Sequence, residues 1–586
     1  MYIIYRYFLF FLCFISLHAA EVTLPTHSIY FTGQKYFDRA TLEDALGVEN
    51  KSFFAFWKSD NPRIKNNLLA TLDESIKSFY KSEGFYDIED DIKETNTTVQ
   101  VTITENEPVR VKSIEIQSDY NISSFIQMKK NDIFRAKIFI SSKNKIIDAL
   151  LRQGYCSYDL NTKAYVDLDK HQVDLRYILK KGDICTFGKL SVTGLKTIDN
   201  NVIVSRLRAV EGEKFNIEKV QETSNNLYKL GSFDSVMIDV NRKFYNVIPV
   251  DIEFKEIEKP YHMEVGVGYD TYVGPRVHGE ITKYNFLGNA QKLNFKASWS
   301  KLEQLAVLSY YKPAFLNLFG YNLDFGSRIG YSNLEFDGFK EEKSFSGAYF
   351  IHENGRLSLK IGMTLESINI KALDNLLKGQ ELKQAVNEGN FILSYPYIDF
   401  VYDARDSKLN PKNGYYLAAH SELGLSYDES ASLYYKTQIE ARVIHTFSDL
   451  TLAMVVKAGV LECESKKGLP ESKYLFLGGA YTNRAYGFRE IGIISSPTKD
   501  SIYGASSMAN LSLEADYPLW GKLYGALFND NTMLTDTAYN FKGEIISSAG
   551  VGVRYMTPIG PFKLDVGFNI HNPSIYGISF QIGQSF

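Results

Sequence analysis

The sequence predicts α+β repeats followed by a membrane β-barrel: three repeats, then a roughly 16-stranded antiparallel transmembrane barrel. Three observations support this fold class. One order of strands and helices recurs three times before residue 258, and alternating apolar and polar residues fill much of 259–586. The first 20 residues also have the composition of an export signal.

The export signal is predicted at residues 1–20. Arg6 supplies a positive start, "YFLFFLCFISL" an apolar centre and "HAA" a small-residue end. The alternative is a membrane anchor, but the apolar run is shorter than the ~20 residues a spanning helix needs. Nothing later in the chain supplies such a run, so a spanning part must be a closed barrel.

Composition narrows the function further. A formal charge of −4 gives no basic field for nucleic acid, so none is expected as a partner. The histidines are scattered, and neither a metal-spaced Cys/His set nor a phosphate-binding glycine loop occurs. We therefore expect no enzyme, no cofactor and no metal site.

The repeats are marked by glycines that end amphipathic helices. Gly84, Gly154 and Gly231 each stop a helix before a strand begins, as a left-handed C-cap does. The predicted order is strand, helix, helix, strand, strand. We place the repeats at 25–108, 109–186 and 187–258, and the barrel at 259–586.

Two cysteines flank a predicted hairpin in the second repeat. With its turn near Lys170–His171, Cys156 and Cys185 fall roughly opposite each other. A disulfide is plausible in an exported protein. Two separate reduced, half-buried thiols are the alternative.

The repeats resemble POTRA domains, the polypeptide-transport-associated modules of periplasmic arms. The resemblance covers about 25–258 and implies that the modules bind unfolded polypeptide by adding it to an exposed sheet edge. Simple spacers are the alternative. Three copies in tandem make the resemblance stronger than any single copy would.

Alternation is clearest in the last two predicted strands. In "FKLDVGFNI" apolar residues alternate with Lys563, Asp565, Gly567 and Asn569, and "YGISFQIGQSF" alternates in the same way up to Phe586. Lipid outside and water inside would require this pattern. A soluble sandwich also alternates, but the export signal and the terminal phenylalanine favour the barrel.

Eleven candidate strands precede Phe476 and five follow Ser506, so residues 474–505 are a loop that starts on the extracellular side. An extracellular loop is also predicted at 371–390. The barrel half resembles the outer-membrane assembly superfamily (the bacterial surface antigen family), which includes BamA, TamA and the two-partner secretion transporters. In that family the sixth extracellular loop folds into the lumen and carries an Arg-Gly-aromatic motif.

The matching loop motif here is Arg484-Ala485-Tyr486-Gly487. Ala485 stands where the family has glycine, which puts the tightest part of the loop tip in doubt, because alanine resists positive φ. Gly487 is the alternative position for such a turn.

The resemblance also implies which acidic residues pair with Arg484. Glu514 matches the acid of the twelfth strand, and Gly525, Phe528 and Asp530 match an element of the thirteenth. Glu514 shares a water-facing side with Ser512 and Asp516. Asp530 shares a face with Phe528, so periodicity does not place it inward, and only the resemblance does. Thr532 replaces a family glycine.

The barrel seam is predicted where the first strand (about 262–271) meets the last (576–586). Gly266, Gly268, Gly577 and Gly583 lie on these strands with Phe586, and would weaken packing along the junction. A weak seam can open sideways and template new strands. Glycines that merely fill a crowded lumen are the alternative.

The resemblance implies an assembly factor that helps outer-membrane proteins, autotransporters among them, enter the bilayer. Three repeats are most like TamA, the outer-membrane component of the translocation and assembly module, since BamA usually has five. That reading implies unfolded outer-membrane clients and an inner-membrane-anchored, TamB-like periplasmic partner. A BamA-like general insertase and a two-partner secretion channel are the alternatives.

Overall fold

The computed structural model describes residues 26–48, 62–240, 246–270, 274–336, 339–373, 387–427, 431–494, 502–557 and 560–582. The predicted export signal, Gly583, Phe586 and most of the 371–390 loop lie outside these residues. The chain divides into two compact units: one comprises 1–191, 209–220 and 239–251, and the other 192–208, 221–238 and 252–586.

The first repeat builds helices against a four-stranded sheet. Its elements are β1 (Thr26–Thr32), α2 (Arg39–Ala45), β2 (Arg63–Lys65), α3 (Asn66–Leu69), α4 (Leu72–Ser82), β3 (Glu89–Glu94) and β4 (Thr98–Thr104). The sheet order is β2-β1-β4-β3, with β1 parallel to β4. Leu72, Ile76 and Tyr80 recur every four residues on α4 and are buried in the core with Val99 and Val101.

The second and third repeats are three-stranded. The second has β5 (Arg110–Ser118), a 3₁₀ turn at Ser123–Phe125, α5 (Ala136–Arg152), β6 (Asp159–Asp167) and β7 (Gln172–Lys180). The third has β8 (Thr186–Thr193), α6 (Asn200–Val204), α7 (Ile217–Tyr228), β9 (Phe233–Val240) and β10 (Val247–Glu256). Their sheet orders, β5-β7-β6 and β8-β10-β9, leave β6 and β9 at sheet edges.

The predicted element order holds with two corrections. The first helix of the second repeat shrinks to a single 3₁₀ turn, since Ser118, Asn121 and Ser123 hold this stretch in local turns. The first repeat also contains an unpredicted strand, β2, which pairs antiparallel with β1 and covers that edge of its sheet.

The helix-ending glycines behave as predicted. Gly84, Gly154 and Gly231 have φ of 97°, 83° and 64°, the left-handed region in which a Cβ is strained. In the second repeat, a disulfide joins Cys156 to Cys185 across the base of the β6–β7 hairpin, with Cα atoms 5.9 Å apart.

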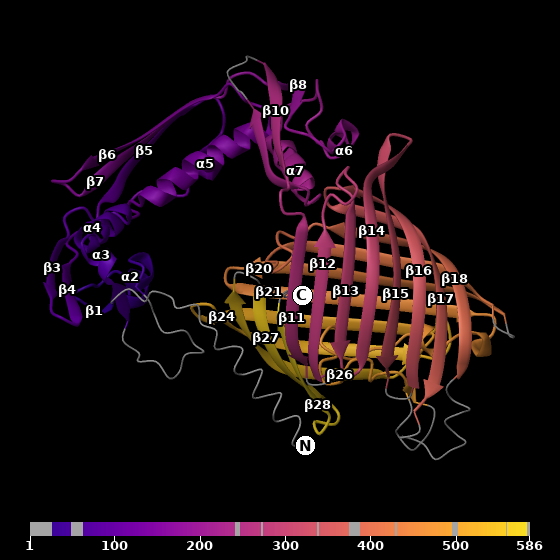
Figure 1. The fold of residues 1–586 in the computed structure, drawn as a ribbon. Helices are drawn as coiled ribbons and strands as arrows, with labels where there is room; N and C mark the ends of the chain where they lie inside the picture. The colour runs from indigo at the N-terminus through magenta and orange to yellow at the C-terminus, as the bar shows by residue number, and fades with distance from the viewer. Residues whose placement is uncertain are drawn as a thin grey trace. The chain divides into compact units, whose positions relative to one another are not determined.

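The C-terminal half forms the predicted sixteen-stranded antiparallel sheet, running from β11 to β28 in chain order (Figure 1). Its strands are β11 (Tyr261–Asp270), β12 (Gly274–Lys283), β13 (Lys292–Ser300), β14 (Glu303–Leu318), β15 (Tyr321–Glu335), β16 (Phe339–Asn354), β17 (Leu357–Ala372), β18 (Gly389–Asp403), β19 (Gly414–Ser426), β20 (Ser432–Phe447), β21 (Leu450–Cys463), β24 (Ser507–Trp520), β25 (Leu523–Thr535), β26 (Ile545–Thr557), β27 (Gly560–Asn569) and β28 (Tyr576–Ile582).

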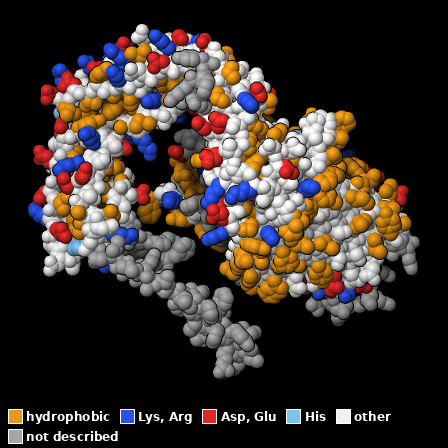
Figure 2. Space-filling view, turned by 45° about the horizontal axis from the view of Figure 1, so that its top comes forward, with side chains coloured by type: hydrophobic (Ala, Val, Ile, Leu, Met, Phe, Trp, Pro, Cys, Tyr) orange, Lys and Arg blue, Asp and Glu red, His pale blue; other side chains and the backbone are white. Residues whose placement is uncertain are grey.

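The two faces of this sheet differ as the alternation predicts. Outward residues of β11 are largely exposed, with Val265 at 78% and Val267 at 73%. On β27, Lys563 and Asp565 are buried on the other face. Figure 2 shows hydrophobic side chains gathered over the barrel wall. The apolar face therefore points out and the charged face points into the lumen, as a bilayer requires.

None of the helices in the described ranges is both long and apolar enough to span a membrane.

Candidate functional site

The loop between β21 and β24 folds back on itself. It contains short 3₁₀ turns at Lys466–Gly468 and Glu471–Lys473 and two short strands, β22 (Ile493–Ile494) and β23 (Ile502–Tyr503). Backbone bridges join Leu475 to Ala505 and Leu477 to Ile491. Leu475, Leu477 and Ile491 pack with Ala505 and Met508 into a small core, so the loop has its own apolar support.

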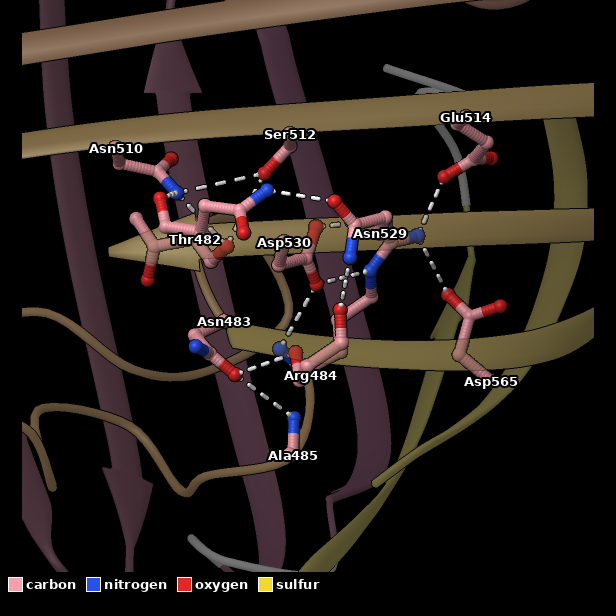
Figure 3. Close-up of polar contacts among 12 residues, drawn as sticks. Thr482, Asn483, Arg484, Ala485, Asn510, Ser512, Glu514, Asn529, Asp530 and Asp565 are labelled. Carbon is pink, nitrogen blue, oxygen red and sulfur yellow. Dashed lines mark hydrogen bonds and ion pairs between the residues drawn. The ribbon is translucent and has the colours of Figure 1, made fainter. Parts of the chain in front are cut away.

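Arg484 projects from this loop to two wall acids (Figure 3). Its Nε and Nη2 donate to the two carboxylate oxygens of Asp530 on β25, at 2.9 and 3.0 Å. Its Nη1 donates to Glu514 on β24, and its backbone N–H donates to Asp530 at 3.1 Å. The planar guanidinium thus uses its fork to hold two carboxylates at once.

A second arginine extends the ion-pair network along the wall. Arg554 on β26 donates through Nη2 to the other oxygen of Glu514 at 2.8 Å, and through Nη1 to Asp565 on β27. Asp565 also lies 3.6 Å from Nη1 of Arg484. The two arginines therefore bridge buried carboxylates on β24, β25 and β27, so each of these three acids has an opposite charge beside it.

Phe528 turns inward beside Asp530, as their shared parity on β25 requires. The Cζ atom of Arg484 lies 3.5 Å from the centre of the Phe528 ring, a cation–π contact. Phe528 is therefore a lumen-facing residue, and Asp530, which has the same parity on β25, faces the lumen with it. Periodicity alone did not indicate this orientation. Gly525, on the same strand, packs near Leu519, 3.2 Å from where its Cβ would stand.

The doubt over Ala485 is removed by the backbone geometry. Neither Ala485 nor Gly487 adopts positive φ; Gly478, Gly479 and Arg489 do so instead, at 104°, 94° and 63°. The positive-φ residues of the loop therefore lie on either side of the motif, and the turn closed by the Tyr486 N–H and the Asn483 carbonyl contains none. Alanine is compatible with position 485 because the turn there does not require a positive φ.

Asn483, which sequence reasoning missed, ties the loop tip to two strands. Its buried amide donates to Thr532 Oγ1 at 3.2 Å and accepts from Ser548 Oγ at 2.8 Å. Thr532 thus supplies a hydrogen-bond partner where the family has glycine. Tyr486 accepts from Asn569 on β27 at 2.6 Å, and Gly487 N–H donates to Glu490.

Lys473 is a second buried cation of the loop, also missed from sequence. Its Nζ lies 2.9 Å from Glu366 on β17 and 3.5 Å from Glu422 on β19. It also sits 3.9 Å from the centre of the Tyr395 ring on β18. The loop is therefore fixed to the β17–β19 wall by Lys473 and to the β24–β27 wall by Arg484.

Gly567 on β27 lets the loop backbone approach the wall. A Cβ there would lie 2.8 Å from the carbonyl carbon of Arg484 and 3.0 Å from the backbone nitrogen of Ala485. We expect Gly567→Val to displace the loop tip and cost about 1–3 kcal/mol, the usual range for overpacking. Thermal unfolding in detergent measures this loss.

Gly279→Val is the matched control for Gly567→Val, because nothing lies within 4 Å of a Cβ at Gly279 on β12. Equal melting temperatures for the two valine variants would contradict the close approach.

Glu471 makes the loop sensitive to pH. Burial raises the pKa of its carboxyl to about 7, although its acceptance of the Gly504 N–H and the charge of Lys466 act to lower it. The closed loop therefore binds this proton more tightly than an open one. The resulting stabilisation is complete below the ordinary pKa of 4.5 and is lost as pH rises to about 7.

We expect the barrel to melt at a lower temperature at about pH 8 than at about pH 5, and Glu471→Gln to reduce this difference. Melting curves at the two pH values, with Glu490→Gln as the control, measure it. A difference that Glu471→Gln leaves unchanged would exclude Glu471 as its source.

The predicted seam strands are the two ends of the sheet. Over the described residues no ladder joins β28 to β11, although the strands approach each other. A Cβ on Gly266 would lie 2.0 Å from Cε1 of His278 on β12, so this glycine makes room for an imidazole. Gly268 pairs with Arg276, and Gly577 with Gly567.

Comparison with known proteins places this arrangement in a family. The Omp85 superfamily domain matches residues 285–586, and POTRA (surface antigen variable number repeat) matches 107–182 and 185–256. The outer membrane protein assembly factor BamA of Nitratidesulfovibrio vulgaris is 22% identical over 557 residues, covering 92% of this chain and 69% of the relative. BamA of Neisseria meningitidis serogroup B is 20% identical over 631 residues, covering 95% and 78%.

A solved structure shares the fold. BamA of Haemophilus ducreyi lacking POTRA domains 1–3 superposes with a TM-score of 0.52 at 17% identity, covering 81% of this chain and all of that one. The relatives are named as assembly factors and not as enzymes. The Omp85 model alone matches more than half of the chain. The chain therefore belongs to the Omp85 superfamily, as an outer-membrane β-barrel that carries POTRA domains in the periplasm.

Proposed function

We propose that this protein is an outer-membrane assembly factor that inserts β-barrel and autotransporter clients, with a TamA-like organisation. The observation that carries the proposal is the seam: the sixteen-stranded sheet ends at β11 and β28 without a ladder between them over the described residues. Unpaired strand edges can accept a client strand by backbone hydrogen bonding.

The lumen loop supports assembly over a simple pore. Arg484 and Lys473 fix the loop inside the barrel by buried ion pairs on two different walls. A conduit would need this loop to leave the lumen, against the cost of two stranded buried charges. A two-partner secretion channel remains the alternative function.

The repeats would capture clients before the barrel does. Strands β3, β6 and β9 each stand at the edge of a sheet and offer backbone groups on one side. In the first repeat the three-residue strand β2 already occupies the edge of β1, so β3 is the longer of the two edge strands there. An inner-membrane-anchored, TamB-like protein is the partner that the TamA-like organisation implies.

Crosslinking at β11 tests the seam. A photoreactive residue at Val265, an outward position of β11, should capture outer-membrane clients in cells. The same residue at Ile361, an outward position of β17 that is 54% exposed, should not. Equal capture at both positions would remove the seam from the mechanism.

Depletion separates the candidate functions. An assembly factor should lower the levels of several barrels and autotransporters together, whereas a dedicated secretion channel should affect one exported substrate. A BamA-like general insertase would lower nearly all outer-membrane proteins. Retrieval of a large inner-membrane-anchored protein with the full chain would favour the TamA-like organisation.

A further inference from the structure

A cavity at the periplasmic end of the lumen is lined by more cations than acids. It has a volume of about 320 Å³ and is lined by the ends of β16–β20, by the turns that join them and by Lys229, which follows α7. The barrel residues around it include the cations Arg356, Arg405, Lys408 and Arg442 and the acids Glu353 and Asp403. Arg442 also lines the small cavity beside Arg484, but the ion pairs of Arg484 are with Glu514, Asp530 and Asp565, none of which lines this site.

Arg405 gives this cavity an unsatisfied donor. Its Nε and Nη2 donate to the two oxygens of Asp403, each at 2.9 Å, which fixes the plane of the guanidinium. The side chain is only 4% exposed, yet its Nη1 has no hydrogen-bond partner among the described residues. A buried donor without a partner is costly and calls for a ligand or ordered water.

Two arginines, Arg405 and Arg442, lie over the same aromatic ring, that of Tyr416. The guanidinium carbons of Arg405 and Arg442 lie 5.0 and 5.1 Å from the centre of its ring. Arg442 also pairs with Glu440, which offsets its charge. Arg356 and Lys408 line the cavity without an ion-pair acid within 4 Å among the described residues. The surplus positive charge therefore comes from these two residues beside the free Arg405 donor.

We propose that this cavity binds the carboxylates of an acidic peptide segment entering from the periplasm. Asp403, Tyr416 and Arg442 lie on the lumen-facing side of their strands, whereas Arg356 and Lys408 are exposed on the adjoining turns. Val401 and the Tyr416 ring add apolar contacts beside the cations, which suits a peptide better than an inorganic anion. The identity of the ligand as a client rests on the proposed assembly function.

Binding to the purified full chain in detergent tests the site. The probe is a tetraglutamate peptide with a neutral fluorophore, measured by fluorescence anisotropy at low and high salt. We expect the Arg356→Gln/Lys408→Gln pair to weaken binding at least about fivefold and to reduce the salt dependence. Arg405 is left intact because its pairing with Asp403 shapes the turn.

The control is Lys301→Gln/Lys542→Gln, which removes the same charge from exposed turns at the other end of the barrel and should not change the affinity. No binding to wild type, or equal affinity in the two double variants, would overturn the site. Competition by inorganic phosphate as strong as by unlabelled peptide would overturn the peptide ligand. Competition by phosphatidylglycerol vesicles would reassign the site to lipid.

The two proposals fail separately. Loss of peptide binding in Arg356→Gln/Lys408→Gln, together with unchanged client levels on depletion of the whole protein, would keep the site and reject the assembly function. Normal peptide binding in the double variant, with clients lost on depletion, would reject the site and keep the assembly function.

Discussion

Arg484→Ala is expected to lower the free energy of unfolding by about 3–5 kcal/mol and to release the loop from the wall. The reason is the number of acids left without their cation: Asp530 and Glu514 both lose direct donors, and Asp565 loses its 3.6 Å neighbour. Arg554 then bridges Glu514 and Asp565, and Lys563 lies 3.9 Å from Glu514. Heat-modifiable migration on gels and client assembly in cells measure the two consequences.

Two further variants make the Arg484 test specific. Arg484→Lys keeps the charge but loses the fork, so it should recover only part of the stability. Arg276→Ala removes an exposed arginine from the outer end of β12 and should leave both readouts at wild type. If Arg484→Ala matches Arg276→Ala, the buried ion pairs do not hold the loop.

Lys473→Met is expected to destabilise the barrel by a similar amount, about 3–5 kcal/mol, at the opposite wall. Methionine fills nearly the same space beside Tyr395, but it leaves Glu366 buried without its cation and leaves Glu422 with only His420, 3.3 Å away, as an ion-pair partner among the described residues. Thermal unfolding gives the loss in stability. Protease accessibility of the loop shows whether this end has detached.

Neutralising the acids provides the control for Lys473. Adding Glu366→Gln and Glu422→Gln to Lys473→Met removes the stranded charges and should restore most of the lost stability. A triple variant no more stable than Lys473→Met would show that the lysine acts through packing and not through its charge.

The barrel could be predicted from sequence because alternation is a local property. Each strand shows its lumen face in its own residues, as Lys563 and Asp565 do on β27, so strand number and orientation followed without long-range information. The glycines that end the repeat helices were equally local. The 3₁₀ turn in the second repeat was missed, because short polar side chains there compete with helix hydrogen bonds.

The site was only half visible in the sequence. Arg484 could be matched to Glu514 and Asp530 through the family motif, whereas Asp530 alone looked outward beside Phe528. Lys473 carried no local signal, since its acids lie on β17 and β19, at least 51 residues earlier in the chain. Asn483 and Thr532 are complementary only once β25 and the loop tip are side by side.

The loop segment between Lys473 and Arg484 is fixed to the barrel wall at both ends, so its conformation depends on the shape of the barrel. Lys473 and Arg484 are close in the sequence, yet they form ion pairs with different parts of the barrel wall. A deformation that moves these two parts of the wall apart must either extend the chain between Lys473 and Arg484 or break the ion pairs of one of them. Widening of the barrel and release of the loop segment are thus energetically coupled. Weakening the ion pairs of either Lys473 or Arg484 makes the barrel wall easier to deform.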